Sequence, residues 1–212
     1  MHMKFEQIPF GRLFSLEHSR VAYIADFALL YASVASLATF LMLAGARERR
    51  GEFAAYALLG FGGWTLIEYM LHRFVLHRLE PFQGWHALHH RRQTDLIYAP
   101  TVLTVGAIAG FVFLPAWMLS DLSRACALTL GLLIGYVAYS VTHHAVHHWR
   151  SGSAWLRRRK RWHSLHHRPG QAGGHYGVTT AFWDHVFRSA PRDTAQPRLT
   201  SHAGPIRLRE GA

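Results

Sequence analysis

The stretch Glu68–His90, EYMLHRFVLHRLEPFQGWHALHH, decides how this chain folds. It leaves an apolar segment and carries five histidines: His72, His77, His86, His89 and His90. Its last part, WHALHHR at 85–91, recurs as WHSLHHR at 162–168, which contains His163, His166 and His167. A fourth group precedes that copy: His143, His144, His147 and His148. Two copies of one arrangement, each following an apolar segment, predict one site built from two halves.

Half of the 212 residues are apolar, and they are concentrated in four long runs: Val21–Ala46, Phe53–Leu71, Ile97–Leu119 and Ala125–Thr142. A helix crosses a bilayer core with about 20 mostly apolar residues, and each run is near that length. The alternative is a soluble protein with four buried helices. Such helices normally keep a polar stripe, which these runs lack, so we favour membrane helices.

The predicted fold class is therefore all-α, with four transmembrane helices in two hairpins and a cytosolic, histidine-rich helical cap. All but four of the 23 lysines and arginines fall on the side of the histidines and both termini, and the positive-inside rule places that side in the cytoplasm. The exceptions are Arg47, Arg49, Arg50 and Arg124. We divide the chain into an interfacial segment at 1–20, a membrane domain at 21–188 and a loose tail at 189–212.

Helical spacing determines which histidines can share an ion. Side chains three and four residues apart lie on one face of an α-helix, so we expect the three histidines of each WHxLHH copy to point one way. His143 and His147 form one such pair, and His144 and His148 form a second, rotated by about 100°. His72 and His77 diverge by about 140° on an ideal helix. They converge only if the helix ends or loosens between them, or if metals lie on both sides.

Twelve of the 17 histidines fall in these groups, which predicts metal binding and, from the duplication, two ions with several imidazoles each. The single cysteine, Cys126, excludes a thiolate site. Imidazole suits Zn, Cu, Fe and Ni. Carboxylates near the histidines are few. We assign Glu68, Asp95 and Asp184 to the surroundings of the ligands, and expect Glu68 and Asp184 to orient imidazole N–H groups.

The motifs together resemble the membrane fatty acid hydroxylase and sterol desaturase family, and are closest to fatty acid 2-hydroxylases. The matching residues are the HX4H box in EYMLHRFVLH, the HX2HH boxes WHALHH and WHSLHH, and HHAVHH before the last box. The closing GHYGVTTAFWDHVFRS and the Asp95…Tyr98-Ala-Pro100 stretch are also similar to that family. The resemblance covers about residues 60–188.

The resemblance implies a membrane-bound di-iron oxygenase that hydroxylates a C–H bond of a fatty acyl chain with O2 and external electrons. It implies no catalytic side chain beyond the metal ligands. Carried over box by box, these ligands are His72, His77, His86, His89, His90, His143, His147, His163, His166 and His167. The doubled HHxxHH leaves His144 and His148 as an alternative pair. We favour His143 and His147, because the family's leading histidine stands four residues before the first histidine of the pair.

Other readings follow from the same residues. A carotenoid or sterol hydroxylase or desaturase of the same superfamily is the alternative enzyme, although His175 stands where sterol-modifying relatives tend to have Asn. A membrane metal transporter or metal-binding protein is the alternative outside enzymes, and histidine-ligated haem is a third. Zinc in these ligands would be redox-inert. We expect a separate electron-transfer protein, a lipid substrate and no nucleic-acid partner; the basic run Arg157–Arg161 suits either an acidic donor or anionic headgroups.

Overall fold

The computed structural model describes residues 19–97, 99, 101–150, 152–168 and 173–190. Most of the predicted 1–20 segment and of the 189–212 tail lie outside the described residues. Every regular element within these residues is helical, which confirms the all-α class. The helices are α1 (Arg20–Leu43), η3 (Arg47–Arg49), α2 (Arg50–Met70), η4 (Leu71–Leu76), α3 (Phe82–Arg91), α4 (Thr101–Ile108), η5 (Ala109–Phe113), α5 (Leu114–Leu119), α6 (Leu122–His148), α7 (Ala154–His166) and α8 (Phe182–Val186).

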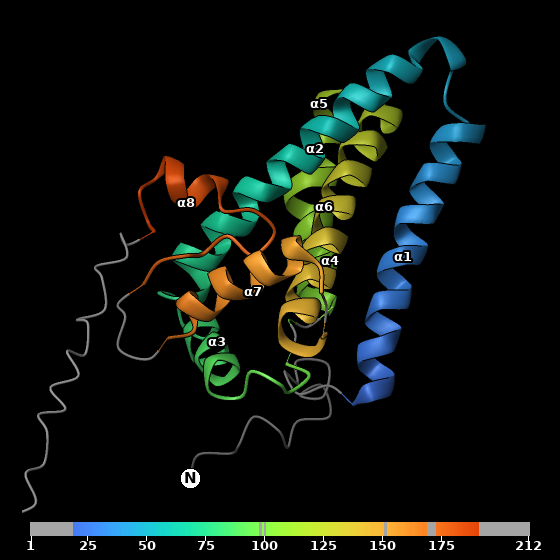
Figure 1. Cartoon of the computed structure of the whole chain (residues 1–212). Helices are drawn as coiled ribbons and strands as arrows, with labels where there is room; N and C mark the ends of the chain where they lie inside the picture. The colour runs from blue at the N-terminus through green and yellow to red at the C-terminus, as the bar shows by residue number, and fades with distance from the viewer. Residues whose placement is uncertain (1–18, 98, 100, 151, 169–172, 191–212) are drawn as a thin grey trace, which may run out of the picture.

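The long helices form a bundle, and the short helices α3, α7 and α8 gather toward one end of it, away from the turn that joins α1 to α2 (Figure 1). The core of the bundle is the contact between α2 and α6. There Trp64 of α2 packs on Leu132 and Tyr136 of α6. This contact joins the two halves of the chain, because α2 leads into the first histidines and α6 carries the second group.

Two of the helices, Arg20–Leu43 and Leu122–His148, are long and apolar enough to cross a membrane, and Leu103–Leu119 is a shorter apolar helix. Apolar side chains on the outside of the bundle are strongly exposed; Phe111, Met118 and Leu119 each have more than 80% of their surface accessible. A surface of this kind suits contact with lipid. The four-span arrangement stays a prediction.

The two interhelical turns at the other end of the bundle are joined by ion pairs. Arg49 contacts Glu52 and Asp121, each at 2.8 Å, and Arg124 contacts Glu52 at 2.5 Å. Two of the four cations that fall on the non-histidine side are thus paired with carboxylates. Their positive charge is locally compensated, which weakens them as signals against the predicted orientation.

Glycine permits the close approach of α2 and α6. A Cβ on Gly60 would lie 2.0 Å from the Leu128 carbonyl oxygen, and one on Gly131 would lie 1.8 Å from the Ala57 carbonyl oxygen. These atoms are backbone, so they cannot move without separating the helices. A Cβ on Gly62 or Gly63 of the same helix would have no neighbour within 4 Å among the described residues.

We predict that Gly60→Ala lowers the thermal stability of the purified protein, whereas Gly62→Ala does not. Both changes gain helix propensity, but only the first inserts a methyl group into the α2–α6 contact, and overpacking typically costs about 1–3 kcal/mol. Unfolding of both variants in detergent measures the difference. Equal stability of the two variants would show that the helices do not pack as described.

Candidate metal centre

Two groups of imidazoles lie at the end of the bundle where α2 and α6 give way to the short helices. Within each group, ring nitrogens approach to within 4.8 Å of one another. Group one combines residues in and directly after η4 with residues of α3 and α7, and group two combines residues of α3, α6 and α7. Group one is His72, His77, His86, His90 and His166; group two is His89, His143, His147 and His163.

His72 and His77 converge because the helix changes its pitch between them. The segment Leu71–Leu76 is a π-helix, which continues α2 without a break. Its hydrogen bonds run from i to i+5, so residues five apart come to lie on one side. The two rings are 5.2 Å apart, centroid to centroid. This is the loosening that their spacing requires, and it aims both side chains into group one.

Each WHxLHH box divides its histidines between the two groups, which differs from the expectation that all three serve one ion. His86 and His90 belong to group one, but His89 joins group two, with its Nε2 3.1 Å from Nε2 of His143. The second box mirrors this: His163 is in group two and His166 in group one. Each half of the chain therefore contributes one histidine to the group that is formed mainly by the other half.

The remaining histidine of the second box, His167, lies between the two groups. Its ring lies beside those of His89, His147 and His163 at 5.0, 5.1 and 4.4 Å, and it stacks on His90 at 4.1 Å. The residue is buried, yet neither ring nitrogen has a hydrogen-bond partner within the described part of the chain. A buried nitrogen without a partner costs free energy unless something binds it, and a metal ion would.

The spacing of the ring nitrogens fits this interpretation. Nε2 of His86 lies 3.0 Å from Nε2 of both His72 and His90, and Nε2 of His166 lies 3.1 Å from Nε2 of both His77 and His90. Adjacent imidazoles at right angles around one ion, with bonds of 2.0–2.1 Å, would be about 2.8–3.0 Å apart. The residues present therefore fit a metal in each group.

Burial keeps these histidines neutral. Burial, together with a smaller effect of neighbouring imidazoles, lowers the pKa of His77 to about 4 and that of His89 and His166 to about 3. The pKa of His86 also falls well below its ordinary value, again chiefly through burial. A neutral imidazole is the form that binds a metal ion. At neutral pH these imidazoles are therefore already in the form that binds a metal ion.

Backbone carbonyls fix the orientation of two imidazoles in group one. Nδ1 of His72 donates to the Tyr176 carbonyl at 2.6 Å, and Nδ1 of His166 donates to the Gly174 carbonyl at 2.9 Å. Nδ1 is then protonated in both rings, which leaves Nε2 with a lone pair directed into the group. The carbonyls come from the segment 174–179, between α7 and α8.

Glu68 and Asp184 bind the backbone of that segment. The sequence instead predicts that they orient imidazole N–H groups. Oε1 of Glu68 accepts hydrogen bonds from the backbone N–H groups of Val178 and Thr179, at 2.7 and 2.9 Å. Oδ1 and Oδ2 of Asp184 accept those of Tyr176 and Gly177, at 2.9 and 2.8 Å. Both side chains are buried. The two carboxylates thus hold the segment whose carbonyls orient the histidines.

The other expected neighbours lie further away. Asp95 pairs with Arg92. His144 and His148 stack on each other at 4.5 Å on a different side of α6, where the Tyr23 hydroxyl lies 3.0 Å from Nδ1 of His144. The structure thus places His143 and His147, and not the alternative pair, among the clustered nitrogens. Their role as ligands stays a prediction.

Sequence reasoning missed the carbonyls of Gly174 and Tyr176, because any residue has a carbonyl. The signal that could have indicated them is GHYG, at 174–177. A Cβ on Gly177 would lie 1.9 Å from the Thr180 carbonyl oxygen, so only glycine fits that position. His175 has φ of 58°, a left-handed conformation that Asn and His tolerate better than most residues. His175 therefore suits this backbone conformation, and Asn at the same position would suit it as well.

A helical bundle with two partly buried imidazole clusters at one end, each of which could hold a metal ion, is typical of a histidine-rich metal-binding protein. Comparison with known proteins is more specific: the model of the fatty acid hydroxylase family matches residues 57–189, which include both clusters and the segment that supports them. The chain belongs to the fatty acid hydroxylase family. Its relatives are oxidoreductases of lipid metabolism.

Individual relatives agree with this assignment. The chain is 34% identical over 143 residues to a dihydroceramide fatty acyl 2-hydroxylase of Arabidopsis thaliana, covering 60% of this chain and 57% of the relative. It is 31% identical over 161 residues to the fatty acid 2-hydroxylase of Rattus norvegicus, covering 69% of this chain and 42% of that protein. The chain thus matches only about half of the length of these relatives.

The fold is shared with a solved structure described as full-length scs7p, in which only the hydroxylase domain is visible. The TM-score is 0.68 and the identity 25%, and the match covers 89% of this chain and 72% of the other. The arrangement of helices is therefore that of a hydroxylase domain.

The lowered histidine pKa values predict that the metal-free protein loses stability as the pH falls from about 6.5 toward 4. Histidine in the unfolded chain titrates near 6.5, so below that pH the unfolded state binds more protons than the folded state and is favoured. Thermal unfolding at pH 7.5 and 5.0 measures the loss. Replacing His77 by Gln should make the profile flatter. A metal-free protein as stable at pH 5.0 as at pH 7.5 would contradict the prediction.

We also predict that Glu68→Ala weakens metal binding by about 10–100-fold, the usual cost of removing groups that orient a ligand. Glu68→Gln should lose much less, because its amide oxygen can still accept the two backbone N–H groups. Chelator competition on purified protein measures the affinity, with the exposed Glu80→Ala as control. Wild-type affinity in Glu68→Ala would show that the carboxylate does not support the site.

Proposed function

We propose that this protein is a membrane-bound, O2-dependent hydroxylase of fatty acyl chains that uses two iron ions. The observation that carries the proposal is the pair of interlocked imidazole clusters in a chain of the fatty acid hydroxylase family. An unactivated methylene cannot be deprotonated by any side chain, so its hydroxylation needs a redox metal with O2. Zinc could occupy the same nitrogens but would be inactive.

We assign His72, His77, His86, His90 and His166 to one iron, and His89, His143, His147, His163 and His167 to the other. Iron bound there would supply the activation of O2 and the oxidation of the C–H bond. The protein's own residues hold the ligands. The carbonyls of Gly174 and Tyr176 keep two imidazoles in the metal-binding tautomer, and Glu68 and Asp184 keep those carbonyls in place. Partial burial disfavours the protonated form of the imidazoles.

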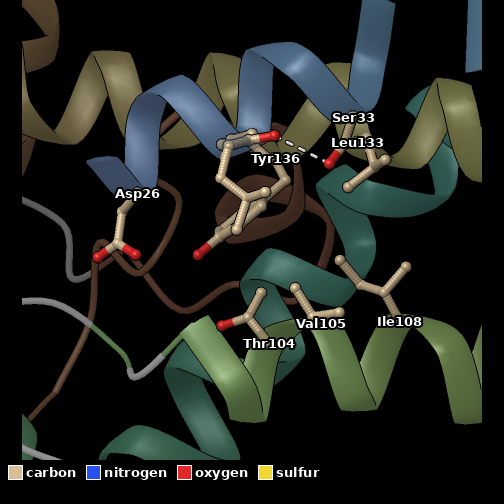
Figure 2. A pocket seen from close by; sticks show the side chains of 9 residues that line it. Asp26, Ser33, Thr104, Val105, Ile108, Leu133 and Tyr136 are labelled. Atoms are coloured by element: carbon tan, nitrogen blue, oxygen red, sulfur yellow. Dashed lines mark hydrogen bonds between the residues drawn. The ribbon is translucent and has the colours of Figure 1, made fainter. Parts of the chain in front are cut away.

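A small cavity of about 40 Å³ lies between α1, α4 and α6, and we propose that it receives part of the acyl chain (Figure 2). Most of its walls are apolar, and Asp26 and Tyr136 contribute polar groups (Figure 2). The Ser33 hydroxyl in its wall is satisfied by the Leu29 carbonyl, at 2.9 Å. The cavity is lined by Asp26, Leu29, Leu30, Ser33, Thr104, Val105, Ile108, Leu133 and Tyr136.

Aromatic contacts along α6 connect this cavity to the metal centre. Tyr136 stacks on Tyr139 with ring centroids 6.1 Å apart, and Tyr139 stacks on His143 of group two at 5.6 Å. A chain bound in the cavity would therefore end near group two. The Asp26 carboxylate can accept hydrogen bonds, so it suits a lipid whose polar end bears hydroxyl or amide groups, such as the dihydroceramide named for one relative.

The setting of this reaction is proposed on the sequence. We place the chain in the membrane with four spans, and the metal site and both termini in the cytoplasm, where a separate electron-transfer protein would meet it. A transporter would carry its ionisable residues near the middle of the bilayer. The histidines instead lie where the bundle ends (Figure 1). The relatives compared above are named for fatty acyl chains, so we prefer these to carotenoids or sterols.

The test is lipid analysis of cells with and without the gene, followed by reconstitution of purified, iron-loaded protein with a chemical reductant. We expect two irons per chain and a hydroxylated acyl product. His166→Ala should lose more activity than the roughly 10–100-fold typical of losing a supporting group, because a ligand itself is removed. His144→Ala is the matched control from the same histidine set, and should retain activity.

Product formation per folded protein and metal content are measured together. One iron or fewer at full loading would rule out the two-ion site. Full activity of His166→Ala at unchanged metal content would rule out the assigned ligands, and a larger loss in His144→Ala than in His143→Ala would transfer the role to the alternative pair.

A further inference from the structure

Very few charged side chains are buried in the described part of this chain. Among all the aspartates, glutamates, lysines and arginines that the structure describes, only Glu68, Asp184 and Arg159 are buried. Their exposed fractions are 4%, 0% and 6%. Removing a charge from water costs free energy, so buried charges in proteins are normally compensated by charges of opposite sign. The roles of the two carboxylates have been described above, and the role of the arginine has not.

Arg159 differs from the other arginines of the basic run 157–161. It shares the buried face of α7 with Leu156, His163 and His166, which are three, four and seven residues away. The other three arginines of the run are exposed. The side chain of Arg159 is therefore directed into the protein, on the side of α7 that carries the histidines, and its charge does not belong to the outer surface of the run.

The Arg159 guanidinium lies within the electrostatic range of both buried carboxylates. Its central carbon is 5.9 Å from the centre of the Trp162 ring, and the indole N–H of Trp162 donates to Oδ2 of Asp184 at 3.3 Å. Burial, and then the neighbouring Arg158, lowers the pKa of Arg159, whereas the charges of Glu68 and Asp184 act in the opposite direction. Within the described residues, Nη1 of Arg159 has no hydrogen-bond partner.

The hydrogen bonds of the two carboxylates leave their charge uncompensated. The donors printed by the geometry are all uncharged: backbone N–H groups of 176–179, the hydroxyls of Thr179 and Ser189, and the Trp162 indole. Such donors satisfy the oxygen atoms but bring no positive charge. In a medium of low dielectric constant, a cation acts on a carboxylate over more than contact distance. Among the described residues, Arg159 is the one buried lysine or arginine that can do so.

We propose that Arg159 is the internal counter-charge of Glu68 and Asp184, and that it positions the clustered imidazoles through them. The guanidinium stays charged in proteins, so it offsets part of the negative charge of the pair at every working pH. The carboxylates hold the segment 174–179, whose carbonyls orient two imidazoles of group one. Arg159 is thus a positioning residue that contacts neither metal nor substrate. The inference rests on the metal binding that is part of the proposed function.

The test uses the full-length protein in detergent, with Co²⁺ as an optical probe that reports ligation by nitrogen. Arg159→Met removes the charge but keeps a long apolar side chain, and Arg159→Lys keeps the charge. Arg158→Met is the matched control, because it removes an exposed arginine from the same helix. Each variant is made in the wild-type protein and in Glu68→Gln, which lacks one of the two buried negative charges. Co²⁺ affinity is measured by chelator competition, and thermal unfolding is measured on the metal-free proteins.

We expect Arg159→Met to weaken Co²⁺ binding about tenfold, which is the lower end of the effect of removing a supporting group. Arg159→Lys and Arg158→Met should bind nearly as tightly as the wild-type protein. In Glu68→Gln, the change Arg159→Met should cost clearly less, because removing both members of a buried charge pair costs less than leaving one alone. The unfolding temperatures of the metal-free variants should show the same coupling.

An equal loss from Arg159→Met in both backgrounds would overturn the proposal, because Arg159 would then act through packing alone. A loss in Arg159→Lys as large as that in Arg159→Met would also overturn it, since the charge would not be the property that matters. A wild-type protein that binds no Co²⁺ would instead refute metal binding and with it the proposed function. The metal-free unfolding measurements then still test the counter-charge, and additive losses there would refute it.

Discussion

The rest of the structure depends on the convergence of neutral imidazoles whose ring nitrogens lie about 3 Å apart. In group one, His86 approaches two other imidazoles at 3.0 Å, and His166 approaches two at 3.1 Å. Protonation of either ring would place a cation among close neighbours in a buried space. The cluster therefore requires neutral rings, and a metal ion would give their lone pairs a common target.

Three features of the chain satisfy this constraint. A π-helical turn brings His72 and His77 to one side, carbonyls of the segment 174–179 fix two tautomers, and two buried carboxylates hold that segment. The glycines at the α2–α6 contact then bring the two halves close enough to share histidines. Because His89 and His166 cross between the halves, neither half can form its cluster alone.

The cavity between α1, α4 and α6 is related to the clusters through α6. Its lining residue Tyr136 stacks on Tyr139, which in turn stacks on His143 of group two. The helix α7 contributes no lining residue to that cavity; it meets the clusters through His163 and His166. The proposed substrate would therefore approach the clusters along α6, while α7 holds their ligands.

The sequence by itself determined the helices, the duplicated boxes and the set of histidines, because helical spacing and apolar runs are local properties. It also gave a loosened helix between His72 and His77 as one of the ways in which these two residues could serve a metal site. Only the tertiary structure decided that His89 joins His143, that His166 joins His77, and that Glu68 and Asp184 bind backbone N–H groups. Spacing along a helix sets the direction in which a side chain leaves it. The partner that the side chain meets depends on how elements distant in the sequence pack together. Here the α2–α6 contact and the path of the segment 174–179 determine that packing.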